Sequence, residues 1–328
     1  IIYNRIVLSA DKINNNLVYD FKSGDVFYFI YDYYGYYTEA YNNTVRYSNP
    51  TSTSQAIYGI YNRYTYNSNY KNNNLYFDVE SNSIVYGFYY YSNSSSYFSD
   101  YNNVYIKDYT VKTNQYYGYA SGNRKSLSDM QVYYQREANS FEADPLFAND
   151  TVLEPKNVIL NNSGDSSLGI TNDFYGVTRN SPPDIGAIEF TPANNDLALV
   201  SLNMPDSGCG LNTAQIEFEV GNFGINSYST FTGYFQVDNG TVKSQTFNNS
   251  MPSGVVTSFT FDSIANFPTP GQSYNVNVWI SATNDGDNSN DSILGNSVKN
   301  IAPILISAND SLYEPVSTNS YPVYGNFD

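Results

Sequence analysis

Paired acidic side chains are the candidates for general acid–base catalysis in this chain. Its 328 residues contain no His and a single Cys, Cys209, which excludes imidazole-dependent hydrolases, thiolate zinc sites and intrachain disulfides. Asp20 and Asp78 occupy matching positions two repeat units apart, roughly 9–10 Å if neighbouring units are spaced like β-strands. That separation permits an inverting glycosidase pair, but no basic side chain recurs beside the two acids. We therefore predict no catalytic residue and no enzymatic activity, and we expect Cys209 to be a small buried side chain.

An oxygen-rich run at residues 284–291 is the candidate metal site. It places Asp285, Asp287 and Asp291 among three Asn side chains, and hard oxygen ligands at this density suit Ca²⁺. The run lacks the terminal Glu of an EF-hand loop, and an acidic hairpin turn is the simpler interpretation. A structural calcium ion that stiffens a domain junction is the only cofactor that we expect.

Tyrosine is the strongest candidate for binding. The chain has 36 Tyr, of which 30 precede residue 191, and Tyr33, Tyr36 and Tyr90 lie in clusters too dense for one inward face. Exposed Tyr rings on a rigid scaffold can stack on sugars or support protein contacts. These three residues are our predicted glycan- or surface-binding positions. The alternative is that the rings cover the edges of the core and stack on one another.

The composition divides the chain near residue 190. Residues 1–190 carry 19 acids and 13 bases, whereas residues 191–328 carry 12 acids and 2 bases. The net charge of −16 repels phosphate backbones, and no apolar run approaches the ~20 residues of a membrane helix. We predict no nucleic-acid partner and no membrane-spanning segment.

Asn-rich turns recur at a regular interval in the first part. The apolar residues that follow them, Leu17, Val45, Leu75 and Val104, are 28, 30 and 29 residues apart. Two further sets keep this phase: Phe29, Gly59, Gly87 and Gly118, and Tyr41, Tyr70 and Tyr101. Three short β-rich segments per period are typical of one solenoid coil. The residues expected to stack inward are Val26, Ile57, Ile84 and Val104, with Asn at corners that tolerate left-handed backbone.

The pattern predicts an all-β chain that begins with a right-handed parallel β-helix. An antiparallel, hairpin-rich sandwich is the alternative, but it gives strands every 8–12 residues or so without a longer period. Two motifs resemble the closing coils of bacterial secreted β-helix proteins: Ser126-Leu127-Ser128-Asp129-Met130-Gln131 followed by residues 139–147, and Ser181-Pro182-Pro183-Asp184-Ile185-Gly186-Ala187-Ile188-Glu189-Phe190. The resemblance implies that residues 1–190 are the C-terminal coils of such a helix.

Residues 191–301 alternate like half-buried antiparallel strands, which predicts a β-sandwich. The segments 196–199, 221–224 and 285–291 resemble the immunoglobulin-like CARDB adhesion modules of large bacterial surface proteins. Residues 302–328 resemble a linker and the start of a further, truncated sandwich, so we expect an internal segment of a longer chain.

Short Asp-Ser and Asp-Thr motifs match the O-glycosylation signal of exported Bacteroidota proteins, although Asp-Ser is also ordinary turn chemistry. The candidate acceptors are Thr151, Ser263, Ser292 and Ser311. These resemblances imply an extracellular, cell-surface segment with a structural and adhesive role, similar to gliding-motility adhesins exported by the type IX secretion system. The implied partners are glycans, solid or cell surfaces, and the type IX secretion or outer-membrane machinery. Two alternatives stay open: a secreted β-helix polysaccharide lyase or hydrolase with its catalytic coils upstream, and a cargo held by its secretion machinery.

Overall fold

The computed structural model describes residues 2–5, 11–19, 26–49, 56–79, 83–91, 96–107, 113–147 and 151–303. Three sheets form the first part, and every pairing within them is parallel except that of β14. Sheet A contains β1 (Ile2–Arg5), β4 (Phe27–Tyr33), β7 (Ala56–Arg63), β10 (Ile84–Tyr90), β13 (Gln115–Ala120) and β14 (Asn123–Arg124). Sheet B contains β2 (Lys12–Asn14), β5 (Glu39–Tyr41), β8 (Ser68–Lys71) and β11 (Tyr97–Asp100). Sheet C contains β3 (Leu17–Val18), β6 (Thr44–Asn49), β9 (Asn74–Val79) and β12 (Asn103–Ile106).

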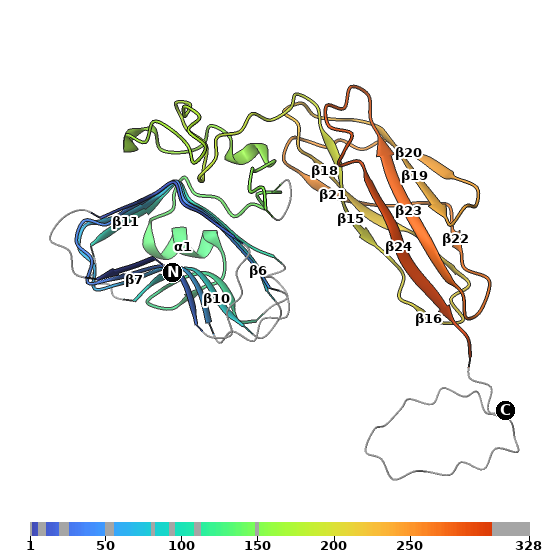
Figure 1. Cartoon of the computed structure of the whole chain (residues 1–328), viewed down its shortest axis with the longest axis horizontal. Helices are drawn as coiled ribbons and strands as arrows, with labels where there is room; N and C mark the ends of the chain where they lie inside the picture. Colours follow the sequence, from blue (N-terminus) through green and yellow to red (C-terminus); the bar gives the residue numbers. More distant parts are fainter. Residues whose placement is uncertain are drawn as a thin grey trace, which may run out of the picture.

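The chain visits sheets A, B and C in turn and then repeats, so each repeat adds one strand to each sheet. Figure 1 looks along this stack, with the three sheets around a shared interior and helix α1 (Leu127–Tyr134) across it. Parallel pairing excludes the antiparallel hairpin alternative for these residues. The interior is filled by aliphatic and aromatic side chains from successive repeats, including Val45, Leu75 and Val104.

The pairing corrects the alignment of the repeat. Val18, not Leu17, pairs with Val45, because the Asn16 amide rather than the Asn15 amide joins the stacked turns. Tyr41 pairs with Lys71, so the Tyr41, Tyr70 and Tyr101 set is wrong. Among the predicted inward residues, Ile57 and Val104 are buried, but Val26 and Ile84 are each 37% exposed because they lie at the start of their segments.

A ladder of buried amides holds the corner between sheets B and C. The Nδ2 atom of Asn16 donates to Asn43 Oδ1 at 2.8 Å, Asn43 donates to Asn73 at 2.9 Å, and Asn73 donates to Asn102 at 3.0 Å. Asn102 in turn donates to Glu137 Oε2 at 3.2 Å. The Oδ1 atoms of Asn43, Asn73 and Asn102 each also accept a backbone N–H of the neighbouring repeat, so the ladder satisfies the polar groups of a turn that is largely closed to water. The residues just before the first three ladder positions, Asn15, Asn42 and Asn72, adopt the left-handed conformation expected of corner Asn.

Helix α1 closes the end of the interior. It begins with a capping box between Ser126 and Asp129, and the Ser-x-x-Asp spacing that forms this box is visible in the sequence. Met130 is buried, and its Sδ and Cε atoms lie over Gly118 of sheet A, where a side chain would leave too little room.

The segment that follows α1 crosses the outside of the Asn corner and contains the 3₁₀ helices η1 (Val158–Leu160) and η2 (Ser166–Leu168). Gly186 N donates to Asn72 O at 2.8 Å, and Arg179 Nη2 donates to Asn15 Oδ1 at 2.9 Å. Arg179 is itself fixed by a buried ion pair with Glu189 at 2.7 Å. The segment therefore fastens successive repeats to one another from outside.

The remaining described residues form a sandwich with its own hydrophobic core, and its strand pairs are antiparallel except for β16 with β24. One sheet contains β15 (Leu197–Asn203), β18 (Glu217–Asn222) and β21 (Val256–Thr260). The other contains β16 (Gly208–Cys209), β24 (Ser292–Ile301), β23 (Ser273–Ser281), β19 (Phe231–Val237) and β20 (Lys243–Phe247), and β17 (Thr213–Ala214) pairs separately with β22 (Ala265–Asn266). The expectation for Cys209 is wrong: it is exposed, because β16 is a two-residue strand at the sheet edge. No helix in the described part of the chain is long and apolar enough to cross a bilayer.

Candidate functional site

Two columns of Tyr cover the outer face of sheet A. The first column contains Tyr28, Tyr58, Tyr86 and Tyr116, and the second contains Tyr31, Tyr61, Tyr89 and Tyr119. Neighbouring rings within a column are stacked, with centroids 4.5–5.6 Å apart. Rings of different columns meet edge to face, as in the 5.2 Å contact between Tyr58 and Tyr61. The rings therefore adopt preferred geometries of aromatic pairs both along each column, where they stack, and between the columns, where they meet edge to face.

The Tyr-x-x-Tyr spacing reaches one face only because each strand is interrupted. Strict alternation would place side chains three residues apart on opposite faces of the sheet. In β7, however, Gly59 has no partner in the strand pairing, and two consecutive residues, Gly59 and Ile60, face the interior. Phe29 and Ile30 repeat this arrangement in β4, as do Gly87 and Phe88 in β10. The recurrence of Tyr at i and i+3 in every repeat is the sequence signal that would have located this face.

The Tyr columns present a neutral surface of ring edges and hydroxyl groups. Burial and the neighbouring phenols raise the pKa of Tyr86 to about 12, and burial raises that of Tyr61 to about 12 despite the nearby Arg63. These two phenols therefore stay protonated at physiological pH. Because each ring stacks on the next, its faces are covered within the column. The columns are thus a stiff hydroxyl-bearing surface rather than a set of free stacking platforms.

A group of more exposed Tyr rings lies instead at the corner between sheets A and B, which we call the aromatic rim. Its members are Tyr34, Tyr36, Tyr37, Tyr64, Tyr66 and Tyr91, and each is between 36% and 49% exposed. Two of them, Tyr34 and Tyr64, stack on each other with centroids 5.1 Å apart. The Arg63 guanidinium lies 4.1 Å from the Tyr91 ring centroid and 4.9 Å from that of Tyr64. The rim therefore combines exposed aromatic rings with one cation, a combination suited to flat, hydroxyl-rich ligands.

The three tyrosines predicted to bind ligands differ in their exposure to solvent. Tyr36 is exposed and belongs to the rim, pairing with Tyr66 of the next repeat. Tyr33 is half-buried and packs against Tyr34 at 4.5 Å. Tyr90 is wrong as a surface residue: it is 2% exposed, and its hydroxyl donates to Ser99 Oγ inside the core. The position of Tyr90 in the strand explains its burial. Side chains alternate between the two faces of a sheet, so Tyr90, which follows the outward-facing Tyr89, points inward.

The candidate catalytic acids do not form a site that the structure describes. Asp20 lies outside the described residues, and Asp78 makes an ion pair with Lys107 at 3.5 Å. A groove of about 470 Å³ near β11 is lined by Asp100, Arg136 and Glu137, among others. Burial raises the pKa of Glu137 to about 7, but its side chain is fully buried and receives hydrogen bonds from Asn102 and Ser140. Glu137 therefore terminates the amide ladder.

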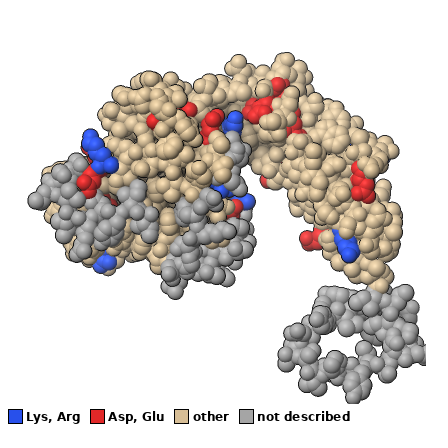
Figure 2. Space-filling view, in the orientation of Figure 1, with Lys and Arg blue, Asp and Glu red and all other residues tan. Residues whose placement is uncertain are grey.

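The predicted calcium ligands lie in the loop between β23 and β24. Asp285 Oδ2 accepts from Leu197 N at 3.0 Å, and Asp287 Oδ1 accepts from Ser289 N at 3.1 Å. Burial, with the charges of Asp285 and Asp196, raises the pKa of Asp291 to about 7. Within the described residues, no three acidic, Cys or His side chains converge in metal-ligating geometry. Figure 2 shows acidic side chains gathered at the end of the sandwich nearest the first part of the chain.

Two of the four candidate glycosylation acceptors are open to solvent. Thr151 and Ser292 are exposed and Ser263 is half-buried, whereas Ser311 lies outside the described residues.

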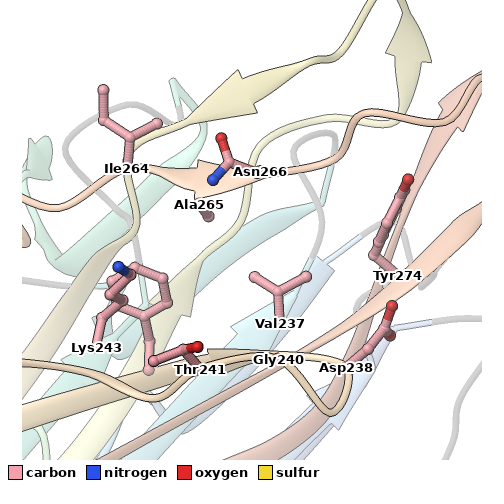
Figure 3. A pocket seen from close by; sticks show the side chains of 10 residues that line it. Val237, Asp238, Gly240, Thr241, Lys243, Ile264, Ala265, Asn266 and Tyr274 are labelled. Atoms are coloured by element: carbon pink, nitrogen blue, oxygen red, sulfur yellow. The ribbon is translucent and has the colours of Figure 1, made fainter.

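A further hollow of about 440 Å³ lies on the sandwich, where β19, β20, β22 and β23 meet (Figure 3). Its acid, Asp238, accepts from Asn275 N at 2.8 Å and fixes the turn after β19. The acid that lines this hollow therefore has a structural role in the turn.

No protein-family model and no curated protein matches the chain. Solved structures of a CARDB domain from Pyrococcus furiosus, by NMR and by crystallography with di-metal ions, are each 20% identical. They align with 34% of this chain and with 97% and 99% of their own, at a TM-score of 0.27. A domain of a putative cell surface protein from Methanosarcina acetivorans is 25% identical over 33% of this chain and 92% of its own, at a TM-score of 0.26.

Proposed function

We propose that this chain is a structural and adhesive segment of a large secreted cell-surface protein, and that the aromatic rim is its contact surface. The observation that carries the proposal is the use of Tyr at strained, exposed corner positions. Tyr34, Tyr37 and Tyr64 adopt φ values of 56–58°, a conformation that costs roughly 1–2 kcal/mol per non-Gly residue. The corner between sheets B and C meets the same demand with Asn15, Asn42 and Asn72, and in its last repeat with the half-buried Tyr101. Exposed Tyr at such a cost indicates a role for the rings outside the fold.

The scaffold suits a load-bearing rod. We propose that residues 1–190 are the last coils of a right-handed parallel β-helix. In-register parallel sheets and the amide ladder support this assignment, and connections between parallel strands of one sheet are right-handed in about 98% of cases. The sandwich would be a CARDB-like immunoglobulin module that spaces the rod from the cell. The further module predicted to start within residues 302–328 lies almost entirely outside the described residues.

The ligand class follows from charge and chemistry. The net charge of −16 disfavours acidic ligands, whereas the hydroxyl groups and exposed rings of the rim, with Arg63, suit neutral polysaccharide chains. We propose neutral glycans on cell or solid surfaces as partners. Export by the type IX secretion system of a gliding Bacteroidota organism, with O-glycosylation at Thr151 or Ser292, is the corresponding proposal for how the protein reaches the surface. The exposure of both side chains supports modification at these positions.

The test is binding of the purified chain to immobilised neutral and acidic polysaccharides. We expect retention on at least one neutral polysaccharide, and the double variant Tyr36→Ser with Tyr66→Ser should weaken it about tenfold, since each aromatic contact contributes roughly 0.5–1.5 kcal/mol. Tyr175→Ser is the matched control, because Tyr175 is 60% exposed but lies outside the rim. Equal loss in the control and the rim variant would refute the assignment of the rim.

A second candidate function uses the same surface. In a secreted β-helix polysaccharide lyase or hydrolase with its catalytic coils upstream, the rim would hold the chain of the substrate. Incubation of the bound polysaccharide with a longer chain that includes upstream sequence separates the two. Release of oligosaccharides would favour the enzyme, and retention without cleavage would favour the adhesin.

A further inference from the structure

The end of the sandwich that carries Asp285 and Asp291 has an unpaired carboxylate in its interior. Asp291 is 8% exposed, and its Oδ1 atom has no hydrogen-bond partner. The Oδ1 atom of the adjacent Asn290 is likewise buried and unpartnered. A buried ionised group is costly unless it is paired with a cation or coordinates a metal.

The surroundings of Asp291 add negative charge. Asp196, just before β15, is tied to this loop because Asn290 Nδ2 donates to its Oδ1 at 3.0 Å. Asp285 is fixed in the same region by the Leu197 backbone. Across the described ranges, no Lys or Arg side chain lies within ion-pair distance of Asp196, Asp285 or Asp291. The charge of Lys156 partly offsets the rise in the pKa of Asp196, but Lys156 forms its ion pair with Glu154 at 4.0 Å. The protein therefore gathers several carboxylates here without an ion-paired cation to neutralise them.

An open hollow of about 630 Å³ gives access to this cluster. The oxygen-bearing side chains of Asn284, Asp285, Asn288 and Asp291 line it. Only two of these are acids, which is consistent with the lack of a three-carboxylate metal cluster among the described residues. Two carboxylates with amide oxygens and water form a hard, all-oxygen donor set, which suits Ca²⁺ and is poor for zinc or copper.

We propose that this hollow binds one calcium ion through Asp285 and Asp291, with Asn284 or Asn288 and water completing the shell. The ion joins the β23–β24 loop to the start of β15, because Asp285 already holds the Leu197 backbone. With two acidic ligands and an open position, we expect an affinity of about 10⁻⁴–10⁻³ M, as in extracellular calcium modules. The site thus becomes occupied outside cells and stays empty at cytosolic calcium concentrations.

The single Trp of the chain makes the test specific. Trp279 lines the same hollow, so Tb³⁺ bound there should luminesce when Trp is excited at the red edge of its absorption band. We expect saturation at one Tb³⁺ per chain and reversal by Ca²⁺. Asp291→Asn should abolish the signal, and Asp285→Asn serves as a second ligand variant. Asp206→Asn, at an exposed acid of another loop, should retain it.

Thermal unfolding provides the second readout. Calcium at 10 times its dissociation constant should raise the midpoint of the sandwich transition by about 5–10 °C, and NaCl of equal ionic strength should not. The proposal is overturned if NaCl reproduces the shift, because charge screening would then explain it. It is equally overturned if Asp291→Asn keeps both the Tb³⁺ signal and the calcium shift, or if the natural sequence shows neither.

Discussion

Removal of one Asn side chain from the amide ladder should destabilise the repeats of sheets A, B and C far more than the small volume of that side chain suggests. Asn73 is fully buried, and its side chain makes four hydrogen bonds. Its Oδ1 atom accepts from the backbone and side-chain nitrogens of Asn43, and its Nδ2 atom donates to Ala40 O and Asn102 Oδ1. Asn73→Ala removes all four and leaves the Asn43 backbone N–H without its acceptor in an interior closed to water.

The magnitude follows from these contacts. Net loss of a buried hydrogen bond costs about 0.5–1.5 kcal/mol, and a buried group left unsatisfied costs about 1–3 kcal/mol. Since neighbouring rungs relax in part, we expect a loss of about 3 kcal/mol in the free energy of unfolding. For a unit of this size that corresponds to a fall of about 6–12 °C in the melting temperature.

Differential scanning calorimetry of the full chain measures this effect. Asn69→Ala is the matched control, since Asn69 lies in the same repeat but is half-buried on β8, and its amide makes only a 3.4 Å contact with Asn67 O. We expect the control to change the stability by less than about 0.5 kcal/mol. If Asn73→Ala costs no more than Asn69→Ala, the ladder does not hold the repeats together and the reasoning fails.

Two further predictions concern the same core. Burial raises the pKa of Glu137 from 4.5 to about 7, so the native state binds the extra proton. This contribution, on the order of 3 kcal/mol, is complete below pH 4.5 or so and is lost as the pH rises through 7. Glu137→Gln should flatten melting temperatures measured between pH 5 and 8, and an unchanged slope would contradict this. A Cβ atom at Gly59 would lie 2.4 Å from the Gly87 carbonyl, so Gly59→Ala should cost about 1–3 kcal/mol in chemical denaturation. Gly208→Ala, which meets no atom nearer than 4.0 Å, should be neutral.

The repeat was predictable because its signals are local. Asn, Gly and Tyr recur at nearly constant intervals, and each marks a turn, a close approach or an outward position. The pairing register was less accessible, because Asn15 and Asn16 are both Asn and only the stacked amides decide which one is the ladder rung. The inward position of Tyr90 likewise depends on the interruption in β10, which shifts the alternation of buried and exposed residues within the strand.

Composition and periodicity alone indicate the class of structure and limit the chemistry available to it. The lack of His, the single Cys and the excess of acids restrict catalysis, and the ~29-residue period, in the range of solenoid repeats, requires stacked units that bury their faces on one another. Which of the many Tyr rings are exposed depends on the packing of the folded chain. Stacking between repeats covers the faces of the columns, while the sharp corner at the aromatic rim leaves six rings accessible. Exposure of a side chain depends on neighbours that are distant in sequence, and for that reason composition could indicate an aromatic surface but not locate it.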